Sequence, residues 1–142
     1  MQGYRVFTFD RTRFPDPKAL TEKLAAQGVK LVTIVDPGIK YQPPKAGVAA
    51  TERTTPELEP QDQRYYVFDE GLEKKYFQHR KNGELFIPRV WPGESVFVDY
   101  TLPEGRRWWG DLHRAYVDNG IAGIWNDMVH QRRTCYVVLT WI

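Results

Sequence analysis

The sequence has little cysteine, no excess of one charge and no long apolar run. Its single cysteine, Cys135, can form no internal disulfide, so the chain is not a disulfide scaffold. Twenty Lys and Arg against eighteen Asp and Glu leave a net charge of +2, which is too even to indicate a nucleic-acid groove or an anionic membrane surface. No apolar run approaches the roughly 20 residues of a membrane-spanning helix, and no secretory signal is visible. We therefore expect no nucleic-acid or membrane partner, and these absences favour the cytoplasm.

Motifs for metal, phosphate and nucleophilic-serine chemistry are missing as well. His79, His113 and His130 lie far apart and lack the i, i+4 spacing or the cysteine partners of a zinc site. The sequence contains no glycine-rich phosphate-binding fingerprint and no Gly-x-Ser-x-Gly elbow. We therefore predict neither a metal site nor a cofactor.

The composition is that of an ordinary globular protein with many aromatic residues. A length of 142 residues suits one domain, and 42% hydrophobic with 27% charged residues argues against disorder. Aromatic residues make up 14%, and five of them are tryptophan. Such a content indicates a large core or a stacking surface for ring-shaped ligands.

The first third of the chain predicts a helix followed by a strand. Asp16 can cap a helix that has Pro17 in its first turn, and Gly28 stops it. Residues 29–35 are rich in β-branched side chains, which predicts a strand buried on both faces, as in parallel sheets. A helix, a glycine turn and an apolar strand form the second half of a βαβ unit.

Residues 41–64 differ from the rest in composition. They contain four prolines and many polar residues, which predicts a long irregular loop or a disordered insertion. This loop follows the carboxyl end of a predicted parallel strand, the end at which ligands bind in α/β folds.

The remaining sequence alternates between helical and extended patterns. We predict a short helix over 69–77, an extended edge or loop over 85–93, a strand over 96–100, a helix from 103 to about 119 and a strand over 121–125. This alternation favours an α/β fold with a parallel sheet. The Trp108-Trp109 pair has the spacing of helix packing.

Two predicted strands end in a carboxylate, Asp36 and Asp127. A carboxylate at the carboxyl end of a barrel strand points into the site. Position alone favours another interpretation for Asp36, in which it caps the turn before Pro37. Asp127 follows Trp125, and a carboxylate beside a tryptophan face suits sugar chemistry, in which the ring stacks and the carboxylate meets an oxocarbenium-like centre.

Five segments in order resemble glycoside hydrolase family 31, the α-glucosidases and α-xylosidases with a (β/α)8 catalytic barrel. They are residues 3–10, 13–20, 32–40, 90–93 and 123–128, and the resemblance covers 1–40 and 65–128. It implies an α/β fold that is a partial (β/α)8 TIM barrel, with about two barrel strands and their helices, incomplete at both ends. Residues 1–128 are then a barrel fragment in which 41–64 are an inserted loop.

The resemblance also implies roles for single residues. Asp127 occupies the position of the nucleophile in the family motif Trp-x-Asp-Met, in a retaining reaction that passes through a covalent glycosyl-enzyme. The implied substrate is an α-linked glucoside or xyloside. Five further residues are expected around the transferred sugar: Ile34, Asp36, Trp91, Trp125 and Met128.

Three departures from the family pattern bear on activity. Met1 corresponds to the last residue of a family strand that carries a sugar-binding aspartate, and the acid/base carboxylate has no counterpart. Residues 129–142 resemble no part of the family, as a frameshift would produce. The insertion either covers the site or is a passive loop. We expect an inactive glycosidase fragment; the alternatives are a non-catalytic sugar-binding or partner-docking remnant and an unrelated α/β domain.

Overall fold

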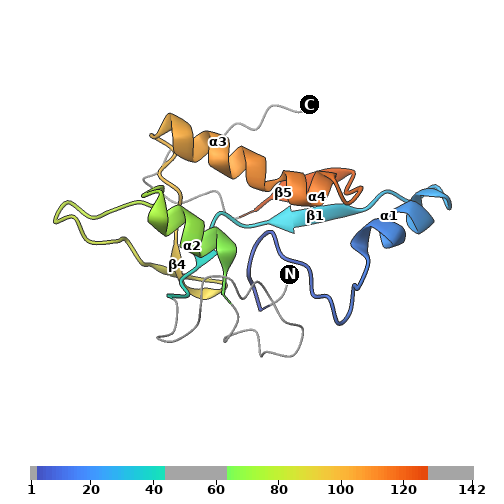
Figure 1. Ribbon diagram of the computed structural model, residues 1–142, viewed down its shortest axis with the longest axis horizontal. Coiled ribbons are helices and arrows are strands. Elements are labelled where there is room, and N and C mark those ends of the chain that lie inside the picture. The colour runs from blue at the N-terminus through green and yellow to red at the C-terminus, as the bar shows by residue number, and fades with distance from the viewer. Residues whose placement is uncertain (1–2, 44–63, 128–142) are drawn as a thin grey trace.

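The computed structural model describes residues 3–43 and 64–127 (Figure 1). Its elements, in chain order, are α1 (Pro17–Ala25), β1 (Val32–Val35), β2 (Ile39–Lys40), α2 (Tyr66–Glu73), β3 (Arg89–Val90), β4 (Gly93–Val96), α3 (Pro103–Leu112), α4 (Arg114–Val117) and β5 (Gly123–Asn126). The expected tail 129–142 and most of the expected insertion 41–64 lie outside the described residues. No helix in the described part is long and apolar enough to span a membrane.

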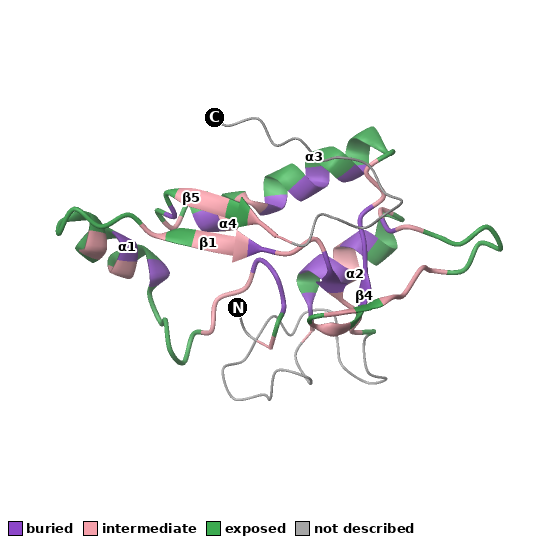
Figure 2. Cartoon of the chain, turned by 180° about the vertical axis from the view of Figure 1, so that it is seen from behind, coloured by how far each residue is buried: buried purple, intermediate pink, exposed green. Residues whose placement is uncertain are grey.

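Strands β1 and β5 form a parallel pair, which confirms the predicted parallel arrangement (Figure 2). Their register sets Ile34 opposite Trp125 and Val35 opposite Asn126. The prediction that residues 29–35 are buried on both faces is wrong. Val29, which precedes β1, is 49% exposed, and Val32, the first residue of β1, is 59% exposed.

The first helix follows its sequence signals. The Asp16 carboxylate accepts a 2.9 Å hydrogen bond from the amide of Ala19, which satisfies one of the free N–H groups at the helix start. The amide of Val29 bonds back to the carbonyl of Leu24, and Gly28 between them adopts φ +77°. The left-handed turn at Gly28 thus ends the helical segment, as predicted.

A second sheet, in the order β2-β4-β3, is antiparallel throughout. The strand expected over 96–100 begins three residues earlier, at Gly93, and Val98 makes only an isolated bridge to Phe77. Tyr41, the first residue of the expected insertion, donates its amide to the carbonyl of Glu94. Prolines at 88 and 92 favoured an edge or loop in the sequence pattern, because proline has no N–H to donate to a strand ladder.

Both later helices differ from their predicted bounds. Helix α2 begins at Tyr66 and ends at Glu73, whereas 69–77 was expected. The helix expected to reach 119 divides into α3 and α4 at His113, whose amide bonds to Gly110 and whose Nδ1 lies 2.8 Å from the Trp109 carbonyl oxygen. A side chain inserted into the helical ladder is a known cause of such breaks.

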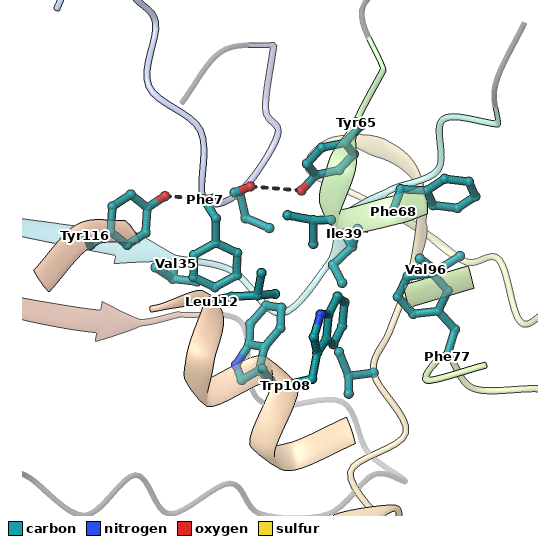
Figure 3. Close-up of a cluster of buried hydrophobic side chains, with 14 of the residues drawn as sticks. Phe7, Val35, Ile39, Tyr65, Phe68, Phe77, Val96, Trp108, Leu112 and Tyr116 are labelled. Carbon is teal, nitrogen blue, oxygen red and sulfur yellow. Dashed lines mark hydrogen bonds between the residues drawn. The ribbon is translucent and has the colours of Figure 1, made fainter. Parts of the chain in front are cut away.

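The core is aromatic and joins the two sheets to α2, α3 and α4 (Figures 2 and 3). Trp108 and Trp109 are 7% and 3% exposed, which confirms that this pair packs in the core. The N-terminal segment is held against the core by tyrosine hydroxyls. The hydroxyl of Tyr65 donates to the carbonyl of Val6 at 3.1 Å, and that of Tyr116 accepts from the amide of Phe7 at 2.8 Å (Figure 3).

Candidate functional site

The register of β1 and β5 brings four of the expected site residues onto one face of the sheet. Side chains alternate between the two faces of a strand, and residues paired in a parallel ladder share a face. Ile34 therefore lies on the same face as its partner Trp125, and Asp36 and Asp127 follow two residues later. Val35, between Ile34 and Asp36, points the other way and is fully buried in the core. The pair of strands β1 and β5 is therefore amphipathic, with one face toward the core and the other face open.

The two strand-ending carboxylates are neighbours. The amide of Asp127 donates to the carbonyl of Val35 at 3.2 Å, which continues the parallel ladder past the last residue of β5. Asp36 follows Val35 directly. Burial, and secondarily the charge of Asp127, raise the pKa of the Asp36 carboxyl above its ordinary value.

Asp36 does not use its Oδ1 atom to cap the turn before Pro37. This oxygen is buried and has no hydrogen-bond partner among residues 3–43 and 64–127. The contrast with Asp99 is direct, since Oδ1 of Asp99 accepts bonds from both the amide and the hydroxyl of Thr101. The structure therefore gives no support to the turn-capping interpretation from this atom.

Trp91 approaches Asp36 from the second sheet. It lies between β3 and β4, and with Asp36, Gly38 and Phe97 it lines a cavity of about 10 Å³, which is about the space that one water molecule requires. Trp91 itself is 68% exposed and Trp125 is 60% exposed. The two tryptophans expected to face a sugar are therefore open, whereas Trp108 and Trp109 are buried.

Gly38 is a site residue that the sequence argument missed. An ideal Cβ at this position would lie 2.8 Å from Cγ2 of Val90, so a larger residue would force a shift, whereas glycine lets the turn after β1 pack closely against Val90. The run Asp36-Pro37-Gly38 carried the signal, but it was interpreted only as the end of a strand.

Met128 lies outside the described residues. Within residues 3–43 and 64–127, no group of three or more His, Cys, Asp or Glu side chains is placed to hold a metal ion.

Comparison with known proteins connects this geometry to a family. The model of the glycosyl hydrolases family 31 TIM-barrel domain matches residues 1–138. Alpha-glucosidase 2 of Bacillus thermoamyloliquefaciens is 42% identical over 128 residues, and alpha-glucosidase of Saccharolobus solfataricus is 36% identical over 128 residues. Each alignment covers 90% of this chain but only 14% and 15% of the respective relative, so the chain spans about a seventh of their length.

Solved structures agree with the sequence comparisons. The family 31 alpha-glucosidase from Bacteroides thetaiotaomicron superimposes with a TM-score of 0.70 at 30% identity, over 94% of this chain and 19% of that one. The catalytic subunit in an ER glucosidase II heterodimeric complex gives a TM-score of 0.65 at 32% identity, over 90% of this chain and 12% of that one. These matches exclude an unrelated α/β domain. The chain belongs to glycosyl hydrolase family 31 and forms a partial α/β piece of its TIM-barrel domain.

Proposed function

We propose that this chain contributes the nucleophile side of the active site of a retaining α-glucosidase-like enzyme, with Asp127 as the nucleophile. The observation that carries the proposal is the placement of Asp127 at the carboxyl end of a parallel barrel strand, on the open face that also bears Trp125 and Ile34. In TIM barrels this end of the strands holds the catalytic residues.

The reaction proceeds in two steps. The Asp127 carboxylate attacks the anomeric carbon of the sugar while the bond from that carbon to the leaving oxygen breaks, which produces a glycosyl ester on the enzyme. A second carboxyl, about 5–5.5 Å from the nucleophile in retaining enzymes, protonates the leaving oxygen and then takes a proton from the water that hydrolyses the ester. The family supplies this acid/base from a barrel strand with no counterpart in the 142 residues.

The side chains around Asp127 bind the sugar. Trp91 and Trp125 present open aromatic faces, on which the C–H groups of a pyranose ring stack. Ile34, half-buried beside Trp125, provides an apolar contact. Asp36 lies at the same end of β1, and Met128 follows the nucleophile directly. Support for an α-linked glucoside or xyloside as substrate comes from the alpha-glucosidase names of the relatives. The reaction needs no cofactor.

The isolated chain should not turn over an aryl α-glucoside. Protonation of the leaving group by an acid typically contributes about 10²–10⁴-fold to the rate. The acid/base carboxyl that would do this has no counterpart in the 142 residues. Turnover by the isolated chain that disappears in Asp127→Asn would contradict this expectation.

A chimera tests the role of Asp127 directly. The 128-residue stretch of the Bacillus alpha-glucosidase 2 that aligns with this chain is replaced by this chain's own segment. The chimera is then treated with 5-fluoro-α-glucosyl fluoride, whose fluoride leaves without protonation, and the labelled residue is found by peptide mass spectrometry. We expect the label on Asp127, and Asp127→Asn to lower turnover by roughly 10⁴-fold or more.

The matched control is Asp118→Asn, which removes an exposed carboxylate at the end of α4 and should keep both label and turnover. A label on another residue would refute the assignment of the nucleophile.

The exposure of Trp91 and Trp125 also favours a second candidate, a non-catalytic sugar-binding remnant. Titration calorimetry of the isolated chain with glucose and maltose decides this case. Heat at millimolar sugar that is lost in Trp91→Ala supports it, and absence of heat removes it.

A further inference from the structure

The sequence contains two Asn-Gly pairs, Asn82-Gly83 and Asn119-Gly120. An asparagine before glycine can lose its side-chain amide, because glycine has no Cβ to hinder attack by its backbone nitrogen. That nitrogen bonds to Cγ of the asparagine, the Cγ–Nδ2 bond breaks, and Nδ2 leaves as ammonia with the proton of the attacking nitrogen. Water then opens the resulting succinimide ring to aspartate or isoaspartate. Both pairs have this chemistry, so a difference between them must come from the fold.

Asn82 lies at the tip of a projecting turn. Residues 79–84 are all exposed, and the segment that contains them extends away from the helices, in yellow-green (Figure 1). Nδ2 of Asn82 donates to Oε2 of Glu84 at 2.8 Å, and its Oδ1 accepts from the amide of Glu84 at 3.1 Å. The amide of Gly83 donates to the carbonyl of Arg80 at 2.9 Å. These bonds stay within the exposed tip, so the local opening that frees the Gly83 nitrogen requires little free energy.

Asn119, just after α4, is held by contacts with distant parts of the chain. Its Nδ2 donates to the carbonyl of Ala115 at 2.7 Å, and its own carbonyl accepts from the hydroxyl of Thr21 at 2.6 Å, although Thr21 lies 98 residues earlier on α1. An ideal Cβ at Gly120 would lie 2.6 Å from Oγ1 of Thr21, so α1 packs closely against this turn. Movement of Asn119 into position for attack must therefore break helical and tertiary contacts together.

We propose that Asn82 is a site of spontaneous deamidation in the folded chain, and that the fold protects Asn119. This modification does not depend on the proposed function. Aspartate at position 82 places a carboxylate beside that of Glu84, in place of the amide that donates to it, and like charges at this distance repel. Isoaspartate also adds one carbon to the backbone of the tip. Both products therefore loosen the turn that precedes β3 and Trp91.

Peptide mass spectrometry of the full 142-residue chain tests this difference. The folded chain is held in mildly alkaline buffer, and the fractions of aspartate and isoaspartate at both asparagines are followed over time. We expect Asn82 to react at least about tenfold faster than Asn119. In concentrated urea the two rates should become similar, because glycine follows both residues and the fold no longer protects either. An Asn82 that reacts no faster than Asn119 in the folded chain would overturn the proposal.

Thr21→Val tests the protection of Asn119 separately. It removes the hydroxyl that donates to the Asn119 carbonyl and keeps the shape of the side chain. We expect the rate at Asn119 to rise and the rate at Asn82 to stay the same. The matched control is Thr12→Val, because the Thr12 hydroxyl donates to Asp10 at an exposed position and should affect neither rate. An unchanged rate at Asn119 in Thr21→Val would overturn the protection by α1.

Discussion

The amide of Phe7 donates a buried 2.8 Å hydrogen bond to the hydroxyl of Tyr116, which lies 109 residues later in the sequence. Phe7 has φ +61°, a left-handed conformation that a residue with a side chain adopts only where its surroundings hold it. The hydroxyl of Tyr66 holds the same residue from the other side by donating to its carbonyl at 3.0 Å. These tyrosines fix the path of the N-terminal segment across the core.

Removal of the Tyr116 hydroxyl should destabilise the fold. Tyr116→Phe leaves the Phe7 amide buried without an acceptor, which costs about 1–3 kcal/mol. Urea denaturation followed by tryptophan fluorescence measures this loss. Tyr4→Phe is the control, because Tyr4 is 60% exposed and should lose almost nothing. Equal stability of both variants would mean that the bond to Phe7 contributes nothing.

Stability should fall in alkaline solution between pH 10 and 12. Burial raises the pKa of Tyr116, and that of Tyr66, from 10.0 to about 12. Because the folded-state pKa is above the unfolded one, the stabilisation is complete below pH 10 and is lost as the pH rises through 12. Urea midpoints across this range check the fall, which should be shallower in Tyr116→Phe and unchanged in Tyr4→Phe. A flat profile to pH 12 would contradict burial of these hydroxyls.

Gly38→Ala should disturb the turn that carries Trp91. The added methyl would lie 2.8 Å from Cγ2 of Val90, and such overpacking costs about 1–3 kcal/mol. Thermal or urea denaturation measures the effect. Gly110→Ala is the control, since nothing lies within 4 Å of its Cβ and its helical position should gain about 0.5–1 kcal/mol. The same sign for both variants would argue against the close contact.

Substitution of a buried tryptophan should lower the free energy of unfolding far more than substitution of an exposed one. Trp109→Ala removes a side chain that is 3% exposed and should cost about 3–5 kcal/mol. Trp125→Ala removes one that is 60% exposed and should change the free energy of unfolding by about 0.5 kcal/mol or less. Denaturation of both variants tests this difference. A large loss in Trp125→Ala would mean that this ring is needed for packing.

The sequence was most informative where local chemistry decides the structure. Asp16, Pro17 and Gly28 specify their helix through capping and backbone freedom alone, and the helix follows. The parallel arrangement of β1 and β5 was predictable because short apolar runs in a helix-alternating pattern favour a parallel sheet, although this pattern does not say which strands pair. The shared face of Asp36 and Asp127 then follows from strand periodicity.

Features that depend on distant contacts could not be predicted. Arg5 is 1% exposed, although arginine is ordinarily found at the surface, and only the folded core buries it. The exposed state of Val32 depends on which layers cover the sheet, which periodicity does not reveal. The second sheet was missed because short strands flanked by prolines resemble loops.

The pairing of β1 with β5 has a consequence for the order in which the molecule assembles. In the sequence, α2, the second sheet and α3 lie between β1 and β5. The contact between these two strands therefore closes most of the chain into one loop. Such non-local contacts form late, because the entropy of closing the loop must be overcome before they contribute. The two carboxylates therefore meet near the end of folding, and substitutions at their strand ends should accelerate unfolding more than they slow folding.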